Sequence, residues 1–211
     1  MRFKDAREAG RALAGRLGAC EGAFAVVAVA RGGVGVGLEV SKGLGLPLDL
    51  LWLSRLLVTR GPLEPACAFS VAGARFLDAE LGPRVEAEPA LAPFVADALA
   101  ELEGHARACR GPRPPLELGG RVVLLVDNGV RTGSTLRAAL RALRSFAPAR
   151  VVAAAPVAAP EALAAIRAAA DEFVCLHTPD PFGHVGLWYE EFERPSDERI
   201  RAMLDEVDSR R

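Results

Sequence analysis

Amide side chains are nearly missing from this chain, which has no glutamine and a single asparagine, Asn128. Lysine is almost as scarce, because Lys4 and Lys42 are the only two among 26 basic residues and arginine carries the rest. Avoidance of amides is typical of some thermophile proteins, and a GC-rich genome would also favour arginine. A chain that avoids asparagine elsewhere but places one inside its most distinctive motif draws attention to position 128.

Long apolar runs and a strong excess of either charge are also absent. No stretch approaches the roughly 20 uninterrupted apolar residues of a membrane span. Residues 1–16 carry charges throughout and lack the apolar core of a signal peptide. We therefore expect a cytoplasmic protein without membrane contact. The formal net charge of −1 provides no general attraction for nucleic acid, so we expect no nucleic-acid partner and only a local anion site.

The cysteines follow neither a metal-binding nor a disulfide pattern. Cys20, Cys67, Cys109 and Cys175 lie far apart, and no C-x-x-C pair occurs. In a cytoplasmic chain this spacing indicates reduced, mostly buried thiols rather than zinc ligands or disulfides.

Short apolar runs alternate with helical patterns along most of the chain. Such βαβ repetition predicts one α/β domain over residues 1–211, with a doubly wound, mostly parallel sheet flanked by helices. Residues 54–85 have no clear period and many Gly and Pro, which indicates an excursion or a short hairpin. We expect strands at 24–30, 48–53, 121–126, 150–157 and 172–176, and helices at 3–18, 34–44, 88–110, 132–146, 160–170 and 196–208.

The most distinctive motif is VVLLVDNGVRTGSTLRAAL, residues 122–140. An apolar strand leads to Asp127, and the T-G-S-T sequence at 132–135 opens a helix at the strand's carboxyl end, where open α/β sheets bind ligands. The first N–H groups of a helix lack internal partners and the helix dipole favours an anion there. One hydroxyl would be enough for an ordinary helix cap. Three hydroxyl residues around Gly133, preceded in the sequence by Asp127, favour a phosphate loop.

Other phosphate-binding motifs fit less well. No lysine follows Gly133, as a Walker A motif requires, and Leu38 interrupts the G-x-G-x-x-G pattern that Gly33 would begin. A second specialised loop, Arg31-Gly32-Gly33, follows the first predicted strand. Its arginine offers a fork of donors that matches phosphate oxygens, although a simple turn with a solvated arginine is the alternative.

These motifs together resemble a known family. VVLLVDNGVRTGST resembles the signature of type I phosphoribosyltransferases, in which a hydrophobic strand and two acidic residues precede a T-G-x-T phosphate loop. VAVARGGVGVGLEVSKGLGLPLDLL, RPPLELGGRVVLLVDNG and TPDPFGHVGLWYEEF are similar to a bacterial subgroup provisionally named as phosphoribosyltransferases. The likeness covers nearly the whole chain, is weakest at 54–85, and does not identify the acceptor.

The resemblance implies Mg²⁺-dependent transfer of a phosphoribosyl group from 5-phosphoribosyl-1-pyrophosphate, with a nucleobase of nucleotide metabolism as one candidate acceptor, and it implies a homodimer. It also implies a core at about 20–176, a flap at 54–85 and a C-terminal hood at 177–211. The implied catalytic residues are Asp127, Asn128 and Arg55, and Asp127 would also bind the metal. The 5′-phosphate would be bound by Gly129, Arg131, Thr132, Gly133, Ser134 and Thr135. The pyrophosphate would be bound by Arg31, Gly32 and Gly33, and the acceptor by Phe182, Trp188 and Tyr189.

Three positions depart from the family pattern. Asn128 replaces the second acid, Arg55 stands where relatives have lysine, and Arg131 replaces a small residue. Asparagine can hydrogen-bond a ribose hydroxyl but supplies no negative charge. The alternative to a working transferase is therefore a sensor or regulator that binds the same ligand, or a nucleotide, without turnover. A purely structural protein with a vestigial site is a third alternative, against which the intact T-G-S-T loop argues.

Other polar and aromatic side chains leave alternatives open. The aromatic residues at 182–189 would equally form a hydrophobic plug or a dimer contact. His177 and His184 are acid–base candidates by residue type alone, and structural roles are commoner. His105 falls on a polar helix pattern, where we expect it to be solvated.

Overall fold

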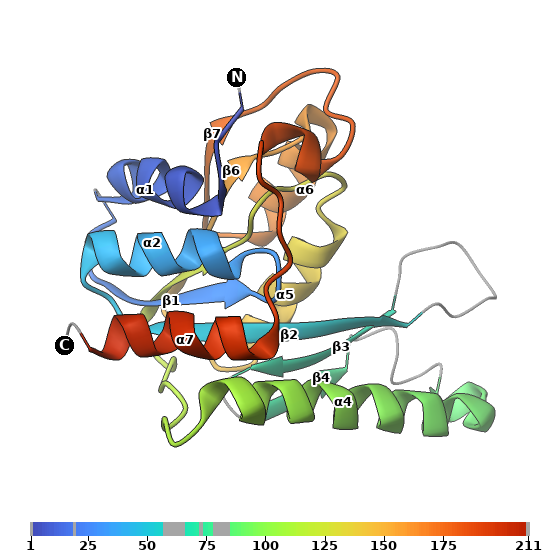
Figure 1. The fold of residues 1–211 in the computed structure, drawn as a ribbon. Coiled ribbons are helices and arrows are strands. Elements are labelled where there is room, and N and C mark those ends of the chain that lie inside the picture. The colour runs from blue at the N-terminus through green and yellow to red at the C-terminus, as the bar shows by residue number, and fades with distance from the viewer. Residues whose placement is uncertain (1, 19, 57–65, 72–73, 78–84, 210–211) are drawn as a thin grey trace.

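A computed structural model of the chain describes residues 2–18, 20–56, 66–71, 74–77 and 85–209, and within these it describes only the backbone at 55–56, 66–69 and 74–76. Seven strands in this part of the chain form one sheet in the order β4-β3-β2-β1-β5-β6-β7 (Figure 1). Neighbouring strands in the part β2-β1-β5-β6-β7 run parallel to each other. The strands are β1 (Ala23–Val29), β2 (Leu48–Leu56), β3 (Ala66–Val71), β4 (Ala74–Leu77), β5 (Val122–Val126), β6 (Arg150–Val157) and β7 (Glu172–His177).

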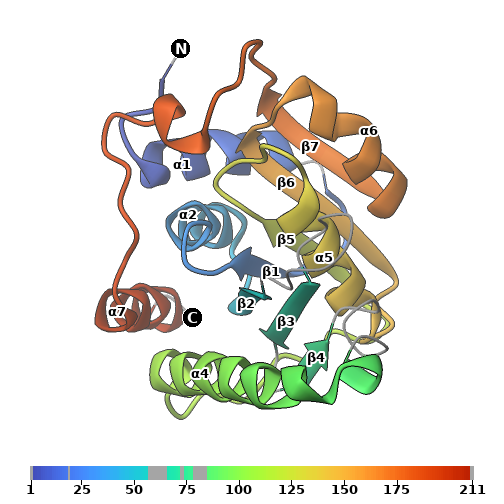
Figure 2. The same ribbon diagram turned by 90° about the vertical axis from the view of Figure 1, so that its right-hand side faces the viewer.

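Helices cover both faces of the sheet, which confirms the predicted doubly wound α/β fold (Figure 2). One apolar core lies under α1, α2, α4 and α7, and a second lies under α5 and α6. The central strands β1 and β5 are buried because their continuous apolar runs face both cores. The helices are α1 (Ala6–Leu17), α2 (Val34–Leu44), α4 (Ala92–Arg110), α5 (Ser134–Arg144), α6 (Pro160–Ala169) and α7 (Asp197–Asp208), with 3-10 turns at Pro89–Leu91 and Val185–Trp188.

The least regular part of the sequence extends the sheet. Strands β3 and β4 form an antiparallel pair beyond β2, as the short-hairpin alternative predicted for 54–85. β2 continues to Leu56 rather than ending at Leu53, because its last residues pair with β3. Most of the predicted flap, including 57–65 and 78–84, lies outside the described residues. No helix in the ranges that the structure describes is both long and apolar enough to cross a membrane.

The order of the strands creates a switch point between β1 and β5. The chain leaves β1 for β2 on one side and later returns to β5 on the other. β1 and β5 pair directly, with Ala28 opposite Val126, so both strands end at the same edge. In doubly wound sheets the crevice for a ligand opens at such a point. The Arg31 loop and the Asp127 loop both begin there.

Helix α2 lies so close to β1 that only glycine fits between them. A Cβ added at Gly37 would lie 2.6 Å from the Cβ of Ala28, well inside contact distance. This close approach positions α2, and with it the loop that joins β1 to α2, over the end of the sheet.

Replacing Gly37 with Ala should therefore destabilise the protein by roughly 1–3 kcal/mol, because over-packing outweighs the better helix propensity of alanine. Gly104→Ala in α4 is the matched control, since an added Cβ there meets nothing within 4 Å. It should leave stability unchanged or raise it by up to about 1 kcal/mol. Urea unfolding measures both variants; equal effects would mean that α2 can move away from β1 at no cost.

Candidate active site

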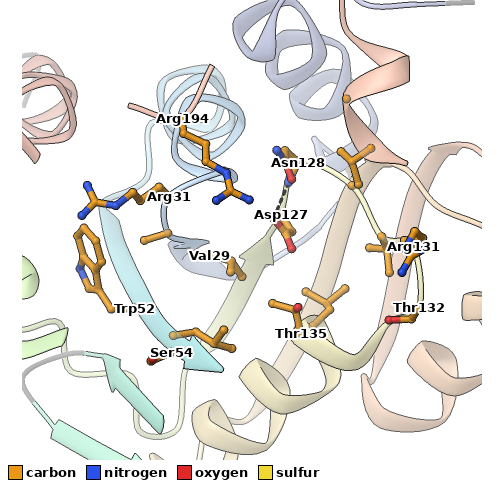
Figure 3. A pocket seen from close by; sticks show the side chains of 18 of the residues that line it. Val29, Arg31, Trp52, Ser54, Asp127, Asn128, Arg131, Thr132, Thr135 and Arg194 are labelled. Atoms are coloured by element: carbon orange, nitrogen blue, oxygen red, sulfur yellow. Dashed lines mark hydrogen bonds between the residues drawn. The ribbon is translucent and has the colours of Figure 1, made fainter. Parts of the chain in front are cut away.

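A cavity of about 770 Å³ opens beyond the carboxyl ends of β1, β2 and β5 (Figure 3). Its wall combines the loop after β1, the end of β2, one side of α4, the loop after β5 and the C-terminal segment before α7. The two loops singled out in the sequence therefore face one cavity. Among the predicted site residues, those that line it are Arg31, Gly32, Asp127, Asn128, Gly129, Arg131, Thr132, Gly133 and Thr135.

The T-G-S-T loop presents the start of α5 to this cavity. Gly133 is the N-cap residue of the helix, with φ of 79°, a left-handed conformation that suits glycine. The first N–H of the helix, that of Ser134, donates to the Thr132 hydroxyl at 3.4 Å. The hydroxyl groups of Thr132 and Ser134 lie 3.1 Å apart. Ser134 does not line the cavity, so it supports Thr132 rather than facing the interior. The helix start thus offers backbone N–H groups and hydroxyls to an anion.

Two backbone hydrogen bonds, one with the last residue of β6 and one with Ala159, hold the preceding turn in place. The N–H of Val130 donates to the carbonyl of Val157 at 2.9 Å, and Ala159 donates back to Val130 at 2.7 Å. The T-G-S-T loop is therefore attached to a rigid strand.

Asp127 and Asn128 lie at the centre of the cavity. Asp127 is buried, and its Oδ1 accepts a hydrogen bond from the backbone N–H of Asn128 at 2.8 Å. A Cβ added at Gly32 would lie 2.8 Å from Asn128 Nδ2, so the amide of Asn128 touches the loop after β1. The hydroxyl of Tyr189 donates to the Asn128 carbonyl at 2.5 Å. Burial, reinforced by the charge of Asp127, raises the pKa of Tyr189 and keeps it a donor.

Arg31 lies in the cavity wall but turns its guanidinium away from Asp127 (Figure 3). The guanidinium lies 5.3 Å above the ring of Trp52 and forms an ion pair with Asp197 at the start of α7. His105 stacks on the same Trp52 ring and lies 2.5 Å from Asp197. Burial pushes the pKa of Asp197 upward, but hydrogen bonds from His105 and Arg31 outweigh it and leave the pKa below its ordinary value. Arg31 is thus already matched by a carboxylate.

Comparison with known proteins agrees with this geometry. The family model of the phosphoribosyl transferase domain matches residues 85–191. A Mycobacterium tuberculosis protein, Rv0571c, which is provisionally named a phosphoribosyl transferase, is 37% identical over 96% of the chain and 46% of its own length. The chain belongs to the phosphoribosyl transferase family. It spans about half the length of this curated relative.

Solved structures place the chain in the same fold. Protein TT1426 from Thermus thermophilus superposes with a TM-score of 0.83 at 35% identity, over 98% of this chain and 99% of TT1426. A purine phosphoribosyltransferase from Pyrococcus horikoshii gives a TM-score of 0.51 at 15% identity, over 90% of this chain and 91% of its own, a likeness of fold alone.

In this member of the phosphoribosyl transferase family, the predicted acceptor residues are not among those that line the cavity. Phe182 and Tyr189 are buried, and the indole N–H of Trp188 donates to the Phe182 carbonyl at 3.1 Å. The N-terminal segment causes this placement, because Phe3 exchanges backbone hydrogen bonds with Trp188 and Glu190 and its ring lies 5.9 Å from Tyr189. The alternative of a hydrophobic plug fits these positions. From the same segment His184, Val185, Gly186, Phe192 and Arg194 line the cavity instead.

Two further predicted residues are Gly33, which is not among the residues that line the cavity, and Arg55. Gly33 is the residue before α2, and its N–H donates to the carbonyl of Val29 at 2.8 Å. Arg55 lies in β2 with its Cα opposite Cys67, and its side chain is outside the described part of the structure. Its catalytic role stays a prediction.

Sequence reasoning missed several residues of the wall. His105, expected to be solvated, is half-buried against Trp52. Trp52 falls inside a predicted strand, and Asp197 lies in the first turn of a predicted helix, where acidic residues are common. Only the packing of α4 and α7 beside β2 brings these residues together. Arg194 had no sequence signal, because a single arginine in an irregular segment is usually solvated.

The side chains present fit Mg²⁺ only as an ion shared with a ligand. Among the described residues no group of three or more His, Cys, Asp or Glu side chains is placed to hold a metal. Asp127 supplies one carboxylate at the cavity, and Asn128 replaces the second acid of the signature. Mg²⁺ commonly keeps several waters and binds through one or two carboxylates plus substrate phosphates, which matches this donor set.

The hydroxyl of Tyr189 connects the hood to the Asp127 loop, so Tyr189→Phe should destabilise the protein. The half-buried Asn128 carbonyl would lose its donor, at a cost of about 1–3 kcal/mol. Ser209→Ala removes a similar but exposed bond, from a hydroxyl to the carbonyl of Glu206, and should change stability by less than about 0.5 kcal/mol. Urea unfolding at neutral pH compares the two; an equally small loss in both would contradict the structural role of Tyr189.

Proposed function

We propose that this chain binds 5-phosphoribosyl-1-pyrophosphate with Mg²⁺ in the cavity and transfers its phosphoribosyl group to an acceptor, with a nucleobase as the first candidate. The observation that carries the proposal is the start of α5, where glycine is the N-cap residue, beside buried Asp127 at the switch point of the sheet. An anion and a ribose fit that pair of features. Family membership supports the phosphoribosyl group as the ligand.

Each part of the ligand has a matching part of the cavity. The T-G-S-T loop would hold the 5′-phosphate, through the N–H groups that open α5 and the Thr132 and Thr135 side chains. Asp127 and Asn128 would face the ribose hydroxyls. The backbone of Gly32, which touches Asn128, would face the pyrophosphate. With the ligand bound in this order, the anomeric carbon would lie between the two phosphate-binding ends.

The reaction would be a displacement at the anomeric carbon. A lone pair of the acceptor forms the new bond to C1, and the bond from C1 to the pyrophosphate oxygen breaks with its electrons leaving on pyrophosphate. The transition state resembles an oxocarbenium ion, as in glycosyl transfer, and the carboxylate of Asp127 would stabilise that positive charge. Mg²⁺, held by ligand oxygens and Asp127, would neutralise charge on the leaving pyrophosphate.

The acceptor has a different wall from the one that the sequence predicts. Phe192 lies at the cavity with 44% of its surface exposed, and its ring centroid lies 5.6 Å from that of Tyr189, with the two rings tilted. His184 and Val185 line the cavity beside it. An apolar ring next to a histidine suits a planar acceptor with polar edges. We place the acceptor there, in the hood formed by residues 177–211.

Titration calorimetry with 5-phosphoribosyl-1-pyrophosphate and Mg²⁺ tests the binding half of the proposal. The wild type should bind, and Gly133→Val should abolish binding, because valine tolerates φ of 79° poorly and an added Cβ lies 3.3 Å from Ile166. Thr132→Val combined with Ser134→Ala removes only hydroxyls and should weaken binding about tenfold. Gly104→Ala is the control, which should bind like the wild type. No binding by the wild type at millimolar ligand would refute the proposal.

The second candidate function is a sensor that binds the ligand without turnover. The neutral Asn128 in place of the second acid favours it, since the developing cation and Mg²⁺ both gain from negative charge. Arg31, which already pairs with Asp197, favours it as well.

Release of pyrophosphate in the presence of a panel of nucleobases separates the two functions. If the protein is a transferase, the wild type should release pyrophosphate. The Asn128→Asp variant should then release it at the same rate or more slowly, because the site is adapted to the amide. A sensor should release none until Asn128→Asp restores the second acid and raises turnover at unchanged affinity. The affinity of both proteins, measured by calorimetry, is the control for binding.

A further inference from the structure

The segment that joins the 3-10 turn Val185–Trp188 to α7 carries an arginine into the cavity. Arg194 lines the cavity, and Figure 3 shows its guanidinium turned inward, on the side where Asn128 lies. Within the described part of the chain, this guanidinium has no hydrogen bond or ion pair. A cationic side chain that faces a cavity without a partner is available to an anionic ligand.

Arg31 differs from Arg194 in this respect. Its charge is matched by Asp197, and its Nη2 lies 3.1 Å from His105. The neighbouring Glu101 adds a second carboxylate, 3.6 Å from His105 Nε2. This wall of the cavity therefore has as many carboxylates as cations, or one more when His105 is neutral. Among the side chains that the structure describes, it therefore offers no surplus of positive charge for a pyrophosphate group.

A third arginine among the described residues of the cavity wall, Arg131, lies in the T-G-S-T region beside Thr132 (Figure 3). It faces the end of the cavity where the 5′-phosphate would bind. Arg194 lies across the cavity, near Asn128 and the loop that contains Gly32. The two arginines therefore serve opposite ends of a ligand with two anionic groups.

We propose that Arg194 is the arginine that binds the pyrophosphate group, and that Arg31 positions Arg194 by anchoring its segment. This inference rests on the proposed function. The anchoring is direct, because Arg31 Nη1 contacts the carbonyl of Pro195 at 3.5 Å as well as the carboxylate of Asp197. Both residues follow Arg194 closely, and the segment continues from them into α7 (Figure 2).

Arg194→Gln tests the first half of the inference. Calorimetry with Mg²⁺ and either 5-phosphoribosyl-1-pyrophosphate or inorganic pyrophosphate should give affinities about tenfold or more below the wild type, because a charge-assisted bond is lost. Ribose 5-phosphate should bind with its affinity changed by less than about twofold. Arg194→Lys keeps the charge and should recover part of the loss. Arg199→Gln, an exposed arginine of α7, is the matched control and should bind like the wild type.

Asp197→Asn tests the second half, because the two roles of Arg31 predict opposite signs. If Arg31 anchors the segment, loss of the ion pair lets Arg194 move and weakens pyrophosphate binding severalfold. If Arg31 itself binds pyrophosphate, removal of its competing carboxylate strengthens binding. Thermal melting of each variant checks that it is folded before titration.

The outcomes separate this inference from the proposed function. A wild type that binds 5-phosphoribosyl-1-pyrophosphate, with an Arg194→Gln variant that binds it equally well, overturns the role of Arg194 and leaves the proposed function intact. Stronger pyrophosphate binding by Asp197→Asn overturns the anchoring role of Arg31. A wild type that binds neither 5-phosphoribosyl-1-pyrophosphate nor ribose 5-phosphate overturns both the proposed function and this inference.

Discussion

The parallel pairing of β1 with β5 determines where a ligand can bind in this molecule. These strands lie side by side but belong to separate halves of the chain. Their carboxyl ends therefore bring a loop near residue 31 and a loop near residue 127 to the same place. The glycine contact between α2 and β1 and the hydrogen bonds between Val130 and β6 keep these loops on rigid supports. The cavity exists because both loops turn outward from adjacent strands.

Local electrostatics matter more than total charge in this chain. A formal net charge of −1 gives no hint of an anion site, yet the start of α5 and two arginines face one cavity. A third arginine of the cavity wall, Arg31, is already paired with Asp197. An arginine that pairs with a carboxylate helps to hold the wall in place, whereas the positive charge of an arginine without a partner is available to an anionic ligand. Residue type alone does not separate these cases.

Regular structure was largely predictable because it depends on short-range patterns. The helix Val34–Leu44 and the strand Arg150–Val157 begin and end at the predicted residues, and α7 begins after Ser196, which caps it through the N–H of Arg199, close to the predicted start at 196. β2 extends further than predicted because its last residues pair with β3, and the residues of β2 alone do not indicate that pairing. The aromatic residues near 182–189 illustrate the same limit, since their burial depends on Phe3 at the other end of the chain.

The sequence by itself determined the fold class, the family and the T-G-S-T loop at the start of a helix, because apolar runs, helix-start residues and a contiguous motif depend only on neighbouring residues. Only the tertiary structure decided which side chains reach the cavity and which of them already have partners. Arg31 and Asp197, or Tyr189 and Asn128, meet through packing of distant segments. Direction and pairing of a side chain are properties of that packing, so local pattern cannot specify them.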